Sequence, residues 1–400
     1  MNERIKELKA AFENTFSCPP ERFFSAPGRT EICGNHTDHQ HGMVFAASVN
    51  KDTLAAVKQN DSDTIRILSE GYPVFELPIH DLEKKDEEQG SSKALIRGIA
   101  RAFSDRGEKL KGFDAYITSQ VGAGSGISSS AAFEVLVAEI INAVFCEHRY
   151  GPLDIAKICN FAENVYFGKP SGLMDQTASA VGGLVFIDFK DPSEPIVEKI
   201  GFDFTSCGYT LLIIDAGSDH ADLTREYAAV TNELKSVCEY FGKKVLREVP
   251  ESDFLNEITA LREKCGDRAV LRAMHVYEEN KRVKAIVSTL KHNDIEGFLD
   301  IVNESGRSSE CMLQNITPCA NTTNQEAAFL LNYSRKILGK KGAVRIHGGG
   351  FGGTVQAFVP NEMLDEFICK TERVMGINSC AVMSIRPYGA AELDAKGNVL

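Results

Sequence analysis

The stretch from residue 113 to 144 has the clearest pattern of apolar and polar positions in the chain. Apolar and polar residues alternate from Phe113 to Val121, which is the period of a half-buried strand. Glycines and serines occupy residues 122–130. Apolar residues then recur at helical spacing, at Phe133, Leu136, Val137, Ile140, Ile141 and Val144. The pattern predicts a strand, a glycine-rich loop and a helix in succession.

The same periodicities predict elements on both sides of this unit. Helices are expected over residues 3–16, 154–167, 171–179, 223–240 and most of 269–299. Short strands are expected over residues 43–50, 53–58, 64–69, 184–189, 209–215, 343–346 and 354–359. The charged run 81–92 is expected to be a solvated loop or the start of a helix.

A chain of 400 residues exceeds what one hydrophobic core usually supports, so two domains are expected. The turn-rich stretch 191–195 is the candidate boundary, with one domain over 1–190 and a second over 191–400.

Charge and cysteine usage narrow the class of protein. The net charge of -12 argues against nucleic acid or an anionic membrane as a partner, because those surfaces select basic proteins. The 11 cysteines are scattered without a C-x-x-C pair, which suits reduced thiols. No signal peptide or membrane-spanning run is visible in the sequence, so a soluble, cytoplasmic protein is expected.

The segment 25–50 crowds Arg29, Asp38 and three histidines, His36, His39 and His41, between two apolar stretches. Such groups are rarely placed together for packing alone, so the segment is expected to bind a polar ligand or a metal. Imidazole and carboxylate at this spacing are zinc ligands, and a metallo-hydrolase is one interpretation. Contacts to a small polar ligand are the other.

Two glycine-rich loops are candidates for close approach to a ligand. The loop 122–130 can cradle phosphate at a helix N-terminus, and its serines offer hydroxyls to a metal ion. It lacks the lysine of a Walker A loop, and a tight turn with a serine cap is the alternative. The loop 348–353 matches G-x-G-x-x-G, but a strand-like segment follows it, which does not fit a dinucleotide site.

Four segments together resemble the GHMP small-molecule kinases and, within them, the galactokinases. They are residues 26–38, with the order Ala-Pro-Gly-Arg-Thr-Glu-Ile-Cys-Gly-Asn-His-Thr-Asp; 124–132, Gly-Ser-Gly-Ile-Ser-Ser-Ser-Ala-Ala; 172–176, Gly-Leu-Met-Asp-Gln; and 348–353. Because the four occur in order from residue 25 to 354, the resemblance covers nearly the whole chain.

The resemblance implies a two-domain α/β (α+β) fold of mixed sheets and helices, with the active site in the cleft between domains. The implied reaction is ATP-dependent phosphorylation of galactose at its anomeric hydroxyl, giving galactose 1-phosphate and ADP. Asp175 would be the catalytic base or would orient the sugar hydroxyl. Arg29 would keep Asp175 ionised and stabilise the transition state.

Other roles follow from motif position. Ser130 and Glu163 match magnesium ligands. The expected ATP contacts are Gly124, Ser125, Gly126, Ile127, Ser128, Ser129 and Ser130, and the expected sugar contacts are Asn35, His36, Thr37, Asp38 and Tyr227. Sugar and ATP are the expected partners of a chain that we expect to be monomeric.

Two departures from the galactokinase pattern concern the acceptor. Asn35 stands where galactokinases carry glutamate, and His39 stands where they carry tyrosine. A kinase of galacturonate or another hexose derivative is therefore the alternative within the family. A non-catalytic regulator that binds sugar and ATP is the alternative from another class, although Arg29, Glu163 and Asp175 argue against it.

Overall fold

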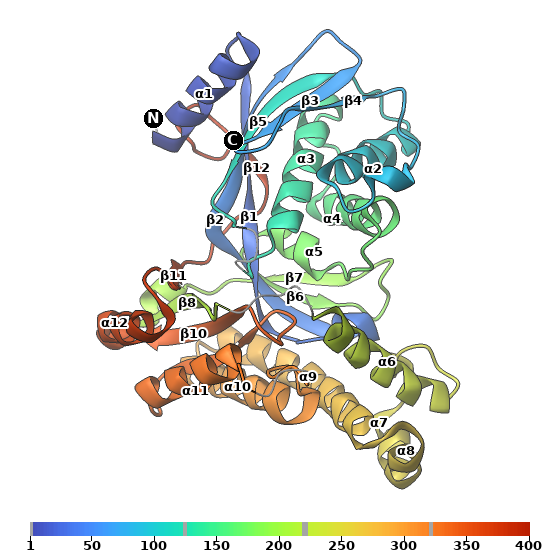
Figure 1. Ribbon diagram of the computed structural model, residues 1–400, viewed down its shortest axis with the longest axis vertical. Helices are drawn as coiled ribbons and strands as arrows, with labels where there is room; N and C mark the ends of the chain where they lie inside the picture. The colour runs from blue at the N-terminus through green and yellow to red at the C-terminus, as the bar shows by residue number, and fades with distance from the viewer. Residues whose placement is uncertain (1–2, 123–125, 218–222, 320–322) are drawn as a thin grey trace.

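Two β-sheets organise the molecule, and helices cover them (Figure 1). The computed structural model describes residues 3–122, 126–217, 223–319 and 323–400. The larger sheet has the order β12-β1-β2-β5-β3-β4, with β6 on β2 and β7 on β6; the smaller has the order β11-β8-β10-β9. Since β3 and β5 are parallel and the other pairs are antiparallel, the larger sheet is mixed. The expected α/β class is confirmed.

The strands of the larger sheet are β1 (Arg22–Cys33), β2 (Met43–Gln59), β3 (Thr64–Ser69), β4 (Phe75–Pro78), β5 (Phe113–Ser119), β6 (Leu184–Asp188), β7 (Ile196–Ile200) and β12 (Ala391–Leu393). Those of the smaller sheet are β8 (Tyr209–Asp215), β9 (Ala343–His347), β10 (Thr354–Pro360) and β11 (Cys380–Met383).

The helices are α1 (Glu3–Phe16), α2 (Ser92–Asp105), α3 (Ser129–Phe145), α4 (Pro152–Phe161), α5 (Met174–Val181), α6 (Thr224–Tyr240), α7 (Glu251–Asn256), α8 (Ile258–Cys265), α9 (Asp267–Lys291), α10 (Ile295–Ser308), α11 (Glu326–Leu338) and α12 (Leu364–Met375). A π-helical turn, Ala162–Phe167, continues α4, and another, Ser309–Leu313, continues α10.

The main core lies between the larger sheet and α2 to α5, which cover one of its faces, while α1 covers the other (Figure 1). A second core joins the lower ends of β1 and β2 to α9 and α10. The smaller sheet packs on α11 and α12. The apolar stripe predicted from Phe133 to Val144 therefore faces the main core, as its helical spacing indicates.

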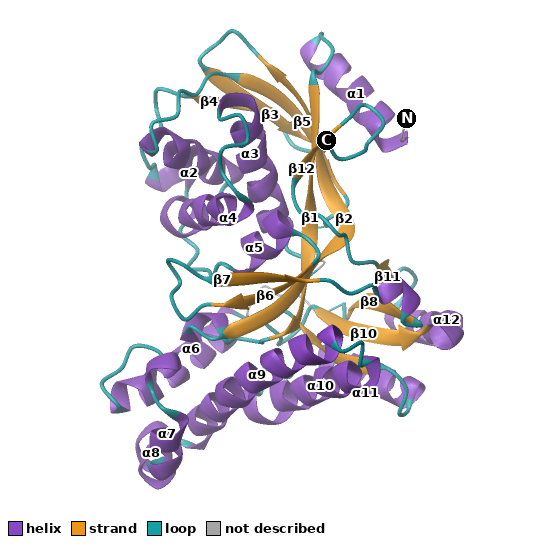
Figure 2. Cartoon of the chain, turned by 180° about the vertical axis from the view of Figure 1, so that it is seen from behind, coloured by secondary structure: helices purple, strands orange, loops and turns teal. Residues whose placement is uncertain are grey.

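Strand β1 is the element that the periodicity did not reveal, although it carries the first motif. All of its residues except Arg22 are buried, so it lacks the alternation of a half-buried strand. Pro27 and Gly28 also look like turn residues, but they coincide with a register shift against β2. The long strands β1 and β2 run through both halves of the molecule (Figure 2).

Two predicted boundaries were wrong. The strands expected over 43–50 and 53–58 are one strand, β2, because the polar residue Asp52 does not turn the chain. Its carboxylate is buried and accepts hydrogen bonds from Ser25 at 2.6 Å and Arg386 at 3.0 Å. The helix expected over 269–299 is two helices, since Asn293 has a φ of 55° and Asp294 caps α10.

The C-terminal strand β12 pairs with β1 in the larger sheet, and Arg22 binds Glu392 on it with an Nε to Oε1 distance of 2.6 Å. The last strand of the chain therefore belongs to the same sheet as the first strand. The division into domains 1–190 and 191–400 stays a prediction.

Candidate active site

The side chains of Arg29 and Asp175 form a two-pronged ion pair at the centre of the candidate site. Arg29 Nε lies 2.6 Å from Asp175 Oδ1, and Nη2 lies 2.8 Å from Oδ2. The remaining guanidinium nitrogen, Nη1, donates to the carbonyl of Gly126 at 2.6 Å. Arg29 thus joins β1 to α5 and to the first glycine-rich loop. Its carboxylate partner, Asp175, lies 146 residues away in the sequence.

Local structure explains how the two side chains meet. The register shift between Pro27 and Arg29 bends β1 at the position from which the Arg29 side chain projects. Asp175 stands in the first turn of α5, where the positive end of the helix favours a carboxylate. Burial works to raise the pKa of Asp175, but the charge of Arg29 and hydrogen bonds from Arg29 and Ser128 hold it below the ordinary value. The carboxylate is therefore ionised at neutral pH.

The first glycine-rich loop contacts this pair through its backbone and one serine. Ser128 has a φ of 60° and donates its hydroxyl to Asp175 Oδ2 at 2.7 Å. The backbone carbonyl of Ile127 accepts from the Arg29 amide at 2.9 Å. Ser129 and Ser130 are the first residues of α3. Gly124 and Ser125 lie outside the described residues.

The second glycine-rich loop, 348–353, closes on the first motif from the other half of the molecule. The side chain of Asn35 donates to the carbonyl of Gly348 at 2.6 Å, and a ring nitrogen of His36 lies 2.9 Å from the carbonyl of Gly349. Tyr227, on α6, donates to the carbonyl of Gly350 at 2.9 Å. Three of the five predicted sugar contacts are therefore brought together around one loop.

Glycine is required where these segments touch. A Cβ on Gly126 would lie 2.2 Å from the hydroxyl of Thr354, at the end of the second loop. A Cβ on Gly349 would lie 2.6 Å from the ring of Tyr227. Both distances are far below van der Waals contact, so the side chains of Thr354 and Tyr227 reach these backbone positions only because glycine has no side chain.

Asn35 is buried and its amide is used within the protein. Its nitrogen donates to Glu31 Oε1 at 3.1 Å as well as to the Gly348 carbonyl, and its oxygen accepts from Asn315 at 2.7 Å. Glu31 in turn pairs with the buried Arg345 at 3.0 Å. Of these partners, Glu31 lies in the first quoted motif; Asn315 and Arg345 lie in none, and the sequence reasoning missed them.

The other two predicted sugar contacts in the first motif are Thr37 and Asp38. The hydroxyl of Thr37 is buried and bonds the carbonyls of Gly34 and Met43, which holds the turn between β1 and β2. Asp38 Oδ1 accepts from the backbone of His39 at 2.9 Å. Within the described ranges, no cluster of three His, Cys, Asp or Glu residues could hold a metal ion, so the zinc interpretation gains no support.

Glu163, the predicted metal ligand, lies on the π-helical turn after α4 and belongs to a buried group of oxygen atoms. Its Oε2 accepts from Gln176 at 2.8 Å, and Gln176 also donates to Glu134 at 3.0 Å. One oxygen each of Glu134 and Gln176 is buried without a hydrogen-bond partner. Ser130 stands one helical turn before Glu134 on α3, so its hydroxyl falls on the same face of that helix.

The sequence reasoning also missed Glu134 and Gln176. Gln176 lies inside a quoted motif, beside Asp175, and Glu134 follows Ser130 by four residues in a helix that is otherwise apolar on this face. A charged residue within an apolar stripe was the signal that could have identified Glu134. Burial and the nearby charge of Glu163 raise the pKa of Glu134 to about 8, so its carboxyl is protonated at neutral pH.

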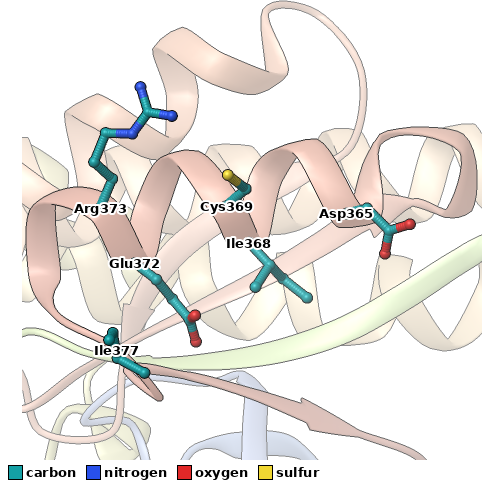
Figure 3. Close-up of a pocket in the computed structure, with 6 residues that line it drawn as sticks. All are labelled: Asp365, Ile368, Cys369, Glu372, Arg373 and Ile377. Atoms are coloured by element: carbon teal, nitrogen blue, oxygen red, sulfur yellow. The ribbon is translucent and has the colours of Figure 1, made fainter.

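A separate hollow of about 480 Å³ lies on α12 (Figure 3). Its lining comes from Asp365 to Ile377, and it includes none of the candidate site residues.

The fold and its pair of glycine-rich loops define the class of GHMP kinases. The model described as "GHMP kinases N terminal domain" matches residues 94–183, and the one described as "Galactokinase galactose-binding signature" matches residues 10–59. The structure is similar to that of a Lactococcus lactis galactokinase complexed with galactose, with a TM-score of 0.82, 24% identity and coverage of 97% of this chain and 99% of that one. A mevalonate kinase has the same fold at a TM-score of 0.62 and 15% identity, covering 92% and 99% of the two chains.

Two other galactokinases have a higher sequence identity to this chain than the Lactococcus lactis enzyme. A Streptomyces coelicolor galactokinase is 32% identical over 367 residues, which cover 90% of this chain and 88% of that protein. A Glaesserella parasuis galactokinase is 31% identical over 368 residues, covering 90% and 91%. The chain belongs to the galactokinase family of GHMP kinases, and it is a sugar kinase.

A membrane-spanning helix is not among the described elements, since none of these helices is long and apolar enough to cross a bilayer.

The buried carboxyl of Glu134 should make the stability of the protein depend on pH. The folded protein keeps a proton up to a pKa of about 8, whereas an unfolded glutamate loses it near the ordinary 4.5. The free energy of unfolding should therefore fall as the pH rises from about 4.5 to about 8, by on the order of a few kcal/mol. Glu134→Gln should abolish this fall, because glutamine still accepts from Gln176.

Urea denaturation at several pH values between 5 and 8 measures this difference. Glu263→Gln, at an exposed glutamate on α8, is the matched control and should follow the wild-type curve. The prediction would be contradicted if the free energy of unfolding had the same pH dependence in the wild type and in Glu134→Gln.

Proposed function

We propose that the chain transfers the γ-phosphoryl group of ATP to the anomeric hydroxyl of galactose, giving galactose 1-phosphate and ADP. The observation that carries this proposal is the Arg29–Asp175 pair, held between the first glycine-rich loop and the first motif. A phosphoryl transfer needs an ionised group beside the acceptor hydroxyl and positive charge beside the transferring phosphoryl group. The two members of the pair supply these groups at adjacent positions.

Asp175 is the group that receives or orients the acceptor hydroxyl. Its pKa lies below the ordinary value, so the carboxylate is ready to accept a hydrogen bond from that hydroxyl. When the anomeric oxygen forms its bond to phosphorus, its proton passes to Asp175 and ADP leaves. Arg29 keeps the carboxylate ionised and offsets charge that develops on the phosphoryl oxygens.

The triphosphate binds at the loop 124–130 and the N-terminus of α3. Backbone amides at the start of a helix of 17 residues favour an anion, and glycine allows the phosphates to come close. The contact of Gly126 with Thr354 places the second glycine-rich loop against this site. ATP is thus held between the two halves of the molecule.

The sugar binds on the side of His36, Asp38 and Tyr227. Asp38 offers its second oxygen, Oδ2, beside Gly172, three residues before Asp175. His36, which follows β1, and Tyr227, on α6, both contact the second glycine-rich loop. Thr37 and Asn35 act through the shape of this site, because their side chains are already engaged by the protein.

The surroundings of Asn35 favour galactose over a uronic acid as the acceptor. Both amide hydrogens of Asn35 are directed to protein oxygens, at Glu31 and Gly348. A substrate carboxylate near Asn35 would therefore meet no free donor from this side chain, and it would approach the carboxylate of Glu31. Neutral galactose avoids both costs.

Magnesium fits the oxygen atoms at Glu163. This hard cation prefers oxygen ligands, and the side-chain oxygen of Gln176, which donates its amide to Glu163, is buried without a hydrogen-bond partner. Ser130 and Glu163 would hold the ion. When bound, it would offset the charge of the ATP phosphates. Lys169, which lies 3.1 Å from Glu163 and is largely exposed, is free to turn away.

Comparison of acceptors tests the proposed reaction. ADP release should be stimulated by galactose, with a kcat/KM at least about tenfold above those for galacturonate, N-acetylgalactosamine and arabinose, because unmatched buried polar groups cost about 1 to 3 kcal/mol. A coupled assay of ADP formation measures all four sugars. A preference for galacturonate would overturn galactose as the acceptor, and absence of turnover with every sugar would overturn the kinase reaction.

Variants of the ion pair test the assignment of its members. Asp175→Asn and Arg29→Ala should each lower kcat by about 10² or more, because the acceptor hydroxyl loses its proton acceptor or the phosphoryl group its positive partner. Steady-state kinetics on galactose measure the effect, with circular dichroism as a check of folding.

Asp114→Asn is the matched control for breaking an arginine–aspartate pair. Asp114 forms a two-pronged pair with Arg66 at 2.7 and 2.5 Å in the larger sheet, away from the site. This variant should lose stability but keep its turnover number. Full activity of Asp175→Asn would contradict the role of Asp175.

Removal of metal tests the role of Glu163. A chelator should abolish turnover, and added magnesium should restore it. Glu163→Gln should raise the magnesium concentration for half-maximal activity by about tenfold or more, because one charged ligand is lost. Titration of activity with magnesium measures this, with Glu263→Gln as control; an unchanged titration curve would show that Glu163 does not bind the ion.

A further inference from the structure

A cavity of about 360 Å³ opens beside Asp38. It lies between the turn 38–41, helix α4, the segment 171–173 that precedes α5, and the residues that follow β6. No role has been assigned above to this cavity. We call it the α4 cavity.

The α4 cavity shares two residues with the proposed sugar site. Asp38 lines it, and its Oδ2 lies so close to Gly172 that a Cβ there would be 2.1 Å away. Gly172 also lines the cavity and stands three residues before Asp175. A sugar that contacts Asp38 therefore has the α4 cavity next to one of its hydroxyls.

The lining of the α4 cavity combines apolar surfaces with hydrogen-bonding groups. Phe161, Leu173 and Phe189 supply the apolar surfaces, and Phe161 is 36% exposed although it is a large aromatic residue. Lys157 and His39 supply donors. Lys157 pairs with Glu194 at 2.9 Å, but that glutamate is 77% exposed, and such surface pairs contribute little. The ammonium group is therefore available to a ligand.

This combination suits a carbohydrate ring. A pyranose presents apolar C–H groups on its faces and hydroxyls at its edge, which match aromatic walls and polar donors respectively. The volume of about 360 Å³ equals that of about a dozen water molecules at ~30 Å³ each. It is too large for a single hydroxyl, and it lies within the range of pockets for small molecules.

We propose that the α4 cavity is a second carbohydrate subsite, which receives a neutral glycosyl residue linked to a galactose hydroxyl beside the one that contacts Asp38. The inference rests on the proposed function, because it takes the reducing-end galactose to occupy the site beside Asp175. The enzyme then phosphorylates a disaccharide in the same way as galactose. The phosphoryl group passes from ATP to the free anomeric oxygen, the hydroxyl proton passes to Asp175, and ADP leaves.

Kinetics with substituted galactoses test the subsite. Three disaccharides are compared with galactose, each with a free anomeric hydroxyl on a galactose that carries a glycosyl residue at O3, O4 or O6. At least one should have a kcat/KM within about tenfold of galactose, since the cavity accepts the added ring. If all three are slower by more than this, the subsite is refuted while the proposed function stands. If galactose is not phosphorylated either, the proposed function fails and the subsite with it.

Two variants connect this ratio to the α4 cavity. Phe161→Ala removes an apolar wall and should lower the ratio of kcat/KM for the accepted disaccharide to that for galactose by about tenfold. Phe329→Ala is the matched control, because Phe329 is 50% exposed on α11 and does not line the cavity; it should leave the ratio unchanged. The same ratio in both variants would overturn the assignment.

Lys157→Trp supplies an independent measurement if Phe161→Ala is poorly folded. The indole fills the cavity instead of opening it, so this variant should also lower the disaccharide-to-galactose ratio by about tenfold. An unchanged ratio would show that the added ring binds elsewhere.

Discussion

The ion pair of Arg29 and Asp175 is the constraint on which the site depends. The Arg29 side chain is only 10% exposed and the Asp175 side chain is 30% exposed, so each charge is partly removed from water and would be costly without the other. The arginine satisfies two carboxylate oxygens and the Gly126 carbonyl at the same time, which determines where β1, α5 and the first glycine-rich loop stand relative to one another. A pair that holds the fold together here is also the pair that the proposed reaction uses. Its geometry is therefore set before any substrate arrives.

Around this pair, the site is assembled from close contacts between glycines and the side chains of other segments. Gly126 lies against Thr354, Gly349 against Tyr227, and Gly172 against Asp38, each at a distance that leaves no room for a Cβ. These contacts join segments that are far apart in the sequence and come from both halves of the molecule. The glycines thus serve two purposes, since the same lack of side chains that lets phosphate approach also lets the loops approach each other.

In the proposed reaction, the choice of acceptor depends on residues that do not touch it. Asn35 would be a candidate sugar contact if it were considered alone, but Glu31, Gly348 and Asn315 use its amide groups. The partner Asn315 comes from the segment after the second π-helical turn, and Arg345 from β9. Specificity at this position is therefore a property of a buried hydrogen-bonded network, in which each member limits what its neighbour can offer to a ligand.

The sequence by itself determined the elements that have a periodic pattern of apolar residues, and the chemistry of the motifs. The alternation at 113–121 and the stripe at 133–144 predicted β5 and α3, because a half-buried strand and an amphipathic helix leave their periods in the sequence. It could not show β1, which is buried on both faces and has no such period, nor the continuity of β2 through Asp52, whose partners are Ser25 and Arg386. The family resemblance already implied that Arg29 acts with Asp175, and the tertiary structure shows the contact between them. Only the tertiary structure decided that Glu134 shares Gln176 with Glu163, and that Asn35 is already engaged. These are contacts between distant segments, and local patterns carry no information about which distant side chain will lie opposite a given residue.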